Sequence, residues 1–205
     1  MMSWSDIRIL SLAVGVFMLT SCAVQPGKQS ATEEQAPEPV EEAKPEFIVV
    51  EPDIQSAFDK ATAHMAAEEF DAAIAVLENL VKREKRLAAP YINLAIAYTK
   101  TDDKKKAREN IDLALKVDRG NPIASNELGL MLRREGKFEE ARKVYLDALE
   151  QSPEYLPVIR NLGILCDIYL RDWDCALEQF EKHQDLQPDD QVKIWIADLK
   201  RRTGG

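Results

Sequence analysis

The chain has 205 residues, 45% of them hydrophobic, and its 36 acidic and 27 basic side chains give a formal net charge of −9 at pH 7. A chain of this length suits one folded domain. The acidic balance makes nucleic acid a poor partner, because binding to phosphates requires an excess of lysine and arginine.

An export signal is predicted at the start of the chain. Residues 9–19 form an apolar run that is too short to cross a bilayer, because a spanning helix needs about 20 apolar residues. The run ends in Leu19-Thr20-Ser21-Cys22, a motif that resembles the lipobox of bacterial lipoproteins. The resemblance implies cleavage after residue 21 and attachment of lipid to Cys22. An ordinary signal peptide, 1–21, with a chance cysteine after it is the alternative.

The residues that follow predict where the lipid holds the chain. Ala23 stands where an Asp, in Gram-negative lipoproteins, resembles an inner-membrane retention signal. The resemblance therefore favours a lipid anchor in the cell outer membrane, on its periplasmic face. Residues 22–52 are rich in proline and glutamate and predict a disordered linker, which spans roughly 30 Å as a coil and about 85 Å as a polyproline helix. Its run Phe47–Val50 either packs against the first helix or serves as a docking motif.

From residue 53 onward the sequence repeats itself, with a period of 34 or 35 residues. One column of small residues holds Ala61, Ala95, Gly129 and Gly163, and a second holds Ala73, Ala107, Ala141 and Ala176. A bulky column holds Leu77, Ile111, Tyr145 and Phe180. Two antiparallel helices explain each unit, because the small residues let the backbones approach and the bulky residues fill the space beside them. Such units stack into a solenoid, since one unit cannot bury its apolar face alone.

The pattern resembles the tetratricopeptide repeat. The best match in the third unit is carried by Asn126, Glu127, Leu128, Gly129, Leu132, Gly136, Phe138, Ala141, Tyr145, Ala148 and Pro153. The resemblance implies an all-α solenoid of four helix pairs over residues 53–190, with repeats at about 54–87, 88–121, 122–155 and 156–190. The fourth repeat has one extra residue near Arg171 and Asp172. Residues 191–205 are predicted to form a capping helix and tail, and a partner-binding amphipathic helix is the alternative.

Motifs that carry catalysis are missing from the sequence. It has no phosphate-binding loop, no nucleophile elbow and no zinc-ligand spacing, so we expect no enzyme, no metal site and no cofactor. His64 and His183 fall in core columns of the repeat, which predicts structural roles for both. Cys166 and Cys175 lie late in one helix and early in the next, where a hairpin can bring two cysteines within bonding reach. A disulfide and two unrelated thiols are both open at this point.

In the tetratricopeptide family the first helices of the pairs line a concave surface that grips peptides or partner proteins. Transferring this surface by register gives these candidate residues: Phe58, Thr62, Met65, Ile92, Asn93, Ile96, Thr99, Asn126, Leu130, Arg133, Arg160, Asn161, Ile164 and Asp167. Asparagine side chains can hydrogen-bond an extended peptide backbone in both directions, and the two arginines add positive charge. The resemblance thus implies a protein or extended peptide partner in the cell envelope.

Together these features predict a non-enzymatic, lipid-anchored periplasmic scaffold or adaptor that helps to assemble an envelope complex. Tetratricopeptide lipoproteins of this build resemble the assembly factors of pili and of outer-membrane machinery. An adaptor for cell-wall enzymes is an alternative in the same class. A peptide- or ligand-binding receptor subunit is an alternative of a different class.

A Cys22→Ala variant is expected to carry no lipid, to escape cleavage after residue 21 and to be poorly retained in the outer membrane. The thiol of Cys22 is the group to which the resemblance assigns lipid, and each buried CH₂ of an acyl chain contributes about 0.8 kcal/mol to membrane binding. Mass spectrometry of the mature N-terminus of the unaltered chain is the measurement. An unmodified Cys22, or a mature chain that begins elsewhere, contradicts the prediction.

Overall fold

The computed structural model of the protein describes residues 50–204. Cys22, its lipobox, and all of the run Phe47–Val50 except its last residue lie outside this part, so the expectations for them stay predictions. The described part holds no strand. Its helices are, in order, α1 (Pro52–Ala66), α2 (Phe70–Arg83), α3 (Ala88–Lys100), α4 (Lys104–Val117), α5 (Pro122–Arg134), α6 (Phe138–Gln151), α7 (Leu156–Ile164), the π-helix η1 (Leu165–Leu170), α8 (Trp173–Leu186) and α9 (Asp190–Thr203).

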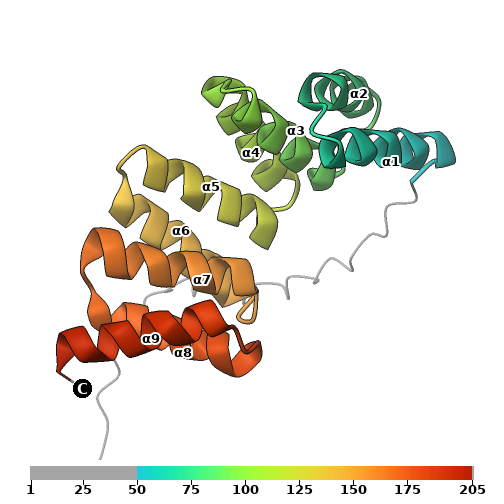
Figure 1. The fold of residues 1–205 in the computed structure, drawn as a ribbon. Coiled ribbons are helices and arrows are strands. Elements are labelled where there is room, and N and C mark those ends of the chain that lie inside the picture. The colour runs from blue at the N-terminus through green and yellow to red at the C-terminus, as the bar shows by residue number, and fades with distance from the viewer. Residues whose placement is uncertain (1–49, 205) are drawn as a thin grey trace, which may run out of the picture. The chain divides into compact units, whose positions relative to one another are not determined.

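Successive helices pack in pairs. α1 packs with α2, α3 with α4, α5 with α6, and α7 and η1 with α8, while α9 packs on α8. Figure 1 shows these pairs stacked one after another, from α1 in cyan to α9 in red. The predicted architecture, an all-α solenoid of four helix pairs with a last helix at its end, is confirmed.

Inside each pair, a small residue of the first helix is matched in the repeat register by a bulky residue of the second, and both are buried. The four buried combinations are Ala61 with Leu77, Ala95 with Ile111, Gly129 with Tyr145, and Gly163 with Phe180. Alanine accompanies an aliphatic side chain, and glycine accompanies an aromatic ring. A Cβ atom added to Gly129 would overlap the ring of Tyr145, and one added to Gly163 would overlap the ring of Phe180. The two columns therefore compensate each other in volume, as close packing requires.

The turns inside the pairs share one backbone conformation. Each has a residue in the left-handed region, with φ of 60°, 63°, 75° and 55° at Glu68, Asp102, Gly136 and Arg171 respectively. A backbone N–H closes each of the first three turns by donating to the carbonyl five residues earlier: Glu69 to His64, Asp103 to Tyr98, and Lys137 to Leu132. In the fourth turn the N–H of Asp172 donates to the carbonyl of Cys166, six residues earlier, at 2.9 Å. The extra residue of this repeat is absorbed there, as the π-helix η1.

A disulfide joins Cys166 to Cys175 across the fourth turn, with their Cα atoms 5.9 Å apart. Cys166 lies in η1 and is fully buried, and Cys175 lies in the first turn of α8. Asp172 adds to the same junction, because its carboxylate accepts a hydrogen bond from the backbone N–H of Cys175 at 3.1 Å and pairs with Arg142 of α6 at 2.7 Å. The disulfide and the Asp172–Arg142 ion pair thus both stabilise the turn that carries the extra residue.

Helix α9 closes the end of the stack. The Asp189 carboxylate caps it by accepting hydrogen bonds from the backbone N–H groups of Gln191 and Val192. Val192 and Leu199 are fully buried, and the ring centroids of Trp195 and Phe180 are 5.3 Å apart. The apolar face of α9 is therefore covered by its own solenoid.

One prediction for a histidine is wrong. His64 does not lie in the core: its side chain is 25% exposed at the end of α1, where Nδ1 lies 2.6 Å from a carboxylate oxygen of Glu69. Within residues 50–204 no helix precedes α1, whereas the equivalent Tyr98 of α3 is buried and donates a hydrogen bond to Glu78 of the preceding helix α2. His183, by contrast, is buried at 5% exposure.

Gly129→Ala is expected to lower the free energy of unfolding by about 1–3 kcal/mol, because the added methyl group overlaps the buried ring of Tyr145. Adding Tyr145→Ile, which recreates the alanine–isoleucine combination of the second repeat, should recover part of this loss. Urea unfolding of both variants measures the effect. Gly120→Ala is the control, since its new Cβ meets no heavy atom closer than 4.0 Å, and it should stay within about 0.5 kcal/mol. Equal losses at the two glycines would contradict the packing described.

Candidate protein-binding surface

The first helices of the repeats face one another along the stack. α1 contacts α3, α3 contacts α5, and α5 contacts α7, whereas the second helices make no comparable contacts with one another within residues 50–204. A stack whose helices are closer together on one side curves toward that side. The first helices, which carry the candidate residues, therefore line the inner side of the curve.

Most candidate residues are partly accessible on this surface. Arg160 is exposed, and the half-buried ones are Phe58, Thr62, Met65, Asn93, Ile96, Thr99, Leu130, Arg133, Asn161, Ile164 and Asp167. Ile92 and Asn126 are buried, at 3% and 7% exposure. Ile92 is covered because it packs in a small core with Ala114 of α4 and Ala124 of α5. It stabilises the junction of the second and third repeats and offers little area to a partner, which corrects its assignment to the groove.

The polar side chains of three candidate residues bond to other residues of the protein itself. Nδ2 of Asn161 donates to Oδ1 of Asn126 at 2.8 Å and so joins α7 to α5. Nδ2 of Asn126 in turn donates to Oε1 of Glu127 at 3.4 Å. Asp167 pairs with Arg202 of α9 at 2.7 Å. Asn126 is thus an internal link and not a group that a peptide backbone can reach, while Asp167 fastens α9 to the fourth repeat.

The two candidate arginines differ in how they present their charge. Arg160 is exposed, with its guanidinium carbon 5.2 Å from the ring centroid of Trp195. Arg133 is half-buried, with its guanidinium carbon 5.8 Å from the ring centroid of Tyr169 and a buried Nη1 that has no hydrogen-bond partner in the described part. Aromatic faces attract cations, so both side chains are held in place. Only Arg160 offers its charge freely to a partner.

Three candidate residues line a cavity of about 470 Å³ between α7, the end of α8 and the start of α9. We call it the α7–α9 cavity, and its lining consists of Leu156, Pro157, Arg160, Asn161, Ile164, His183, Gln187 and Asp189. His183 is almost fully buried, and its Nδ1 has no hydrogen-bond partner within residues 50–204. The backbone N–H of Val192 holds the pKa of the Asp189 carboxyl below its usual range, and the backbone N–H of Gln191 and the charge of Arg160 add to this effect. The cavity thus joins an apolar wall, the cation of Arg160 and the carboxylate of Asp189.

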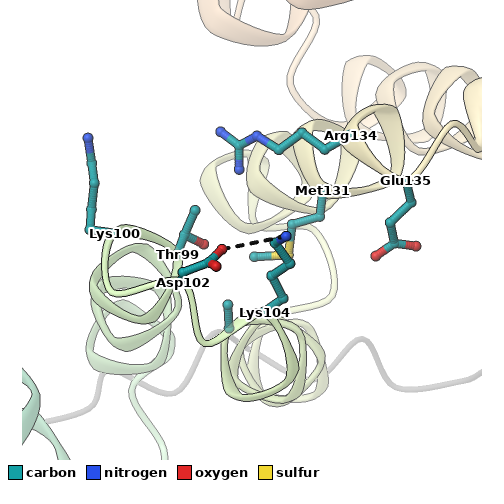
Figure 2. A pocket seen from close by; sticks show the side chains of 8 residues that line it. Thr99, Lys100, Asp102, Lys104, Met131, Arg134 and Glu135 are labelled. Atoms are coloured by element: carbon teal, nitrogen blue, oxygen red, sulfur yellow. Dashed lines mark ion pairs between the residues drawn. The ribbon is translucent and has the colours of Figure 1, made fainter.

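A second cavity, of about 460 Å³, opens between the α3–α4 turn and the end of α5 (Figure 2). It is lined by Thr99, Lys100, Asp102, Lys104, Ala107, Met131, Arg134 and Glu135, of which only Thr99 is a candidate residue. Asp102 pairs with Lys104 at 3.5 Å, while no ion pair holds Lys100 or Arg134 in the described part of the chain. These two cations end α3 and α5, where the helix dipole favours positive charge. Their position is therefore explained without a ligand.

Reasoning from sequence missed the part of the α7–α9 cavity that comes from outside the first helices. His183, Gln187 and Asp189 belong to α8 and to its connection with α9. The repeat register assigns surface residues on first helices only, so it holds no information on what the next helix contributes. The one available signal is His183 itself, a polar residue in a column that is otherwise apolar.

Within residues 50–204, no helix combines the length and the apolar character needed to cross a membrane. In the same part of the chain, no group of three His, Cys, Asp or Glu side chains is placed to hold a metal ion.

Comparison with known proteins identifies the family. A family model of the tetratricopeptide repeat matches residues 58–109 and 92–155. The fold is similar to that of pilF from Pseudomonas aeruginosa, with a TM-score of 0.67 and 24% identity over 73% of this chain and 68% of that one. It is also similar to MamA from Desulfovibrio magneticus RS-1, with a TM-score of 0.63 and 18% identity over 76% of this chain and 88% of that one. The chain is a tetratricopeptide-repeat protein.

Curated relatives share only the repeat region. The probable UDP-N-acetylglucosamine–peptide N-acetylglucosaminyltransferase SPINDLY of Solanum lycopersicum is 28% identical over 93 residues, which are 45% of this chain and 10% of that protein. The BBSome complex member BBS4 of Bos taurus is 23% identical over 118 residues, 52% of this chain and 23% of that protein. The chain thus spans less than a quarter of the length of either relative.

Glu127→Gln is expected to stabilise the protein more at pH 7 than at pH 4. Burial raises the pKa of the Glu127 carboxyl, although the hydrogen bond from Asn126 and the charge of Arg134 act against it. Because the folded pKa lies above the unfolded one, the contribution of Glu127 to stability is present at low pH and lost as the pH rises through the folded pKa. The glutamine stays neutral and avoids this loss. Urea unfolding at both pH values measures the difference, with Glu150→Gln, exposed on α6, as the control; a gain that does not grow with pH contradicts the prediction.

Proposed function

We propose that this protein is a non-enzymatic scaffold that binds an extended segment of a partner protein on the concave side of its solenoid. The fold supports this proposal, because tetratricopeptide repeats are protein-interaction modules and generally carry no catalysis. The similarity to SPINDLY covers a tenth of that protein and therefore brings no transferase activity to this chain.

The observation that carries the proposal is the composition of the α7–α9 cavity. Leu156, Pro157 and Ile164 supply apolar area, and Arg160 supplies an accessible positive charge. The half-buried amide of Asn161 supplies hydrogen-bonding groups that an extended backbone can meet. This combination fits a peptide segment that has a small apolar side chain next to a carboxylate.

The cellular setting of the proposal rests on the sequence. The motif at residues 19–22 supports a lipid anchor at Cys22, and Ala23 supports the periplasmic face of the outer membrane. A linker over residues 22–52 would let the folded part reach partners at some distance from the anchor. Assembly of an envelope complex, such as pilus or outer-membrane machinery, is the role that follows from the resemblance to lipoproteins of those classes.

Arg160→Glu is the sharpest test, because it reverses the one freely presented charge of the cavity. Reversal adds repulsion to the loss of an attraction, so we expect the yield of co-purified envelope partners to fall at least about tenfold. Arg133 is less suitable, since its half-buried guanidinium also contributes to packing. Quantitative mass spectrometry of partners recovered from cells with the anchored, full-length chain is the measurement.

Lys143→Glu is the matched control, because Lys143 is exposed on the second helix α6 and its substitution changes the net charge equally. It should recover the same partners as the unaltered chain. Circular dichroism and the melting temperature should be unchanged in both variants. Equal recovery of the same partners by Arg160→Glu would place recognition elsewhere.

A further inference from the structure

Three large apolar side chains are exposed at the turn between η1 and α8. Ile168, Tyr169 and Trp173 are 62%, 43% and 43% exposed, and we call them the η1 patch. Single exposed apolar residues are common on proteins, but a cluster at one turn is informative. The equivalent turns hold the polar pairs Lys100-Thr101 and Arg134-Glu135 in the second and third repeats. The fourth repeat therefore departs from its neighbours in the chemistry of its turn, and not only in its length.

The η1 patch is held in a fixed conformation. Along the chain, Cys166 precedes the η1 patch and Cys175 follows it, so their disulfide closes the turn that carries the patch. The ring centroid of Tyr169 lies 4.7 Å from that of Phe138 in the third repeat. A surface that is ordered before its partner arrives loses less conformational entropy on binding. This arrangement suits a docking surface better than a loose turn would.

Two cations at the η1 patch have no ion pair within residues 50–204, the half-buried Arg133 over the ring of Tyr169 and the exposed Arg171. Asp167 pairs with Arg202, and Asp172 pairs with Arg142, each at 2.7 Å. Arg171, at the tip of the turn, has no ion pair within residues 50–204, although the chain as a whole is acidic. Asp174 lies in the first turn of α8, where the helix dipole offsets its charge. The patch therefore favours a partner that brings an acidic group to its rim.

We propose that the η1 patch docks an amphipathic helix of a partner protein. The apolar face of that helix covers Ile168, Tyr169 and Trp173, and a carboxylate on its rim pairs with Arg171. Tyrosine, tryptophan and arginine are the residues that most often dominate binding energy in protein interfaces. A lipid surface is less suited, because anionic headgroups would repel Asp174 and a chain of net charge −9.

This surface is separate from the α7–α9 cavity, although Tyr169 contacts Arg133 of the candidate surface. The η1 patch lies at the turn of the α7–α8 hairpin, whereas the α7–α9 cavity is lined by α7 and by the far end of α8. The two surfaces can therefore be tested independently, and Arg160→Glu should leave binding to the η1 patch unchanged within about twofold.

The first experiment places a photoreactive benzoylphenylalanine at position 168 of the full-length chain in its own envelope. Position 194 is the matched control, because Ile194 is 60% exposed and Ile168 is 62% exposed. Mass spectrometry of the cross-linked peptides identifies what lies against each position. We expect position 168, and not position 194, to cross-link to one segment of another protein, a segment with an apolar helical face and at least one Asp or Glu.

The second experiment measures binding of a synthetic peptide of that segment to the purified, unlipidated chain by calorimetry. Ile168→Ser with Trp173→Ser should weaken binding at least about tenfold, and Arg171→Glu about three- to tenfold. The control variant Ile194→Ser with Ile123→Ser removes similar exposed area, since these residues are 60% and 44% exposed, and should stay within about twofold of the unaltered chain. Melting temperatures confirm that the variants are folded.

Several outcomes overturn the proposal. They are equal cross-linking at positions 168 and 194, no protein adduct at position 168, adducts to lipid, and adducts to a second copy of this chain. A cross-linked segment without an acidic residue overturns it as well, as does a peptide whose affinity the patch variant leaves unchanged. None of these outcomes bears on the α7–α9 cavity, so failure here is distinguishable from failure of the proposed function.

Discussion

The match between a buried small residue on each first helix and a buried bulky residue on each second helix sets the geometry on which the rest of this protein depends. Where the bulky residue is Leu77 or Ile111, alanine suffices opposite it, and where it is Tyr145 or Phe180 only glycine leaves room. Interiors are close-packed, so this exchange of volume lets aliphatic and aromatic repeats follow one another in a single stack. Along this stack the first helices of successive pairs also contact one another.

The candidate binding surface follows from that arrangement. First helices that lie close together present their outward residues side by side, and the stack must end where no further repeat covers it. Here α9 ends it, and α9 also completes the α7–α9 cavity beside Arg160. Helix α9 thus both covers the end of the solenoid and, through its N-cap Asp189, contributes to the lining of this cavity.

The fold was predictable from the sequence because its columns are strictly periodic. Ala61, Ala95, Gly129 and Gly163 recur every 34 residues and are all buried. The binding surface was less predictable, since register gives the direction of a side chain but not what covers it. Ile92 and Arg160 occupy the same position two repeats apart, yet Ile92 is sealed against α5 while Arg160 is exposed. The cavities, the π-helix and the Asn126–Asn161 link depend on neighbouring elements, which the sequence pattern does not describe.

The extra residue of the fourth repeat also bears on how such a protein diverges. Its effect ends within the turn, because Ala176 and Phe180 resume the buried columns directly after it. Because each repeat contacts only its neighbours, the structural change caused by an inserted residue stays local. An insertion in a sheet or in a globular core would disturb distant contacts. Solenoids of this kind can therefore acquire new surface chemistry through small insertions at their turns, while the packing of their interior stays the same.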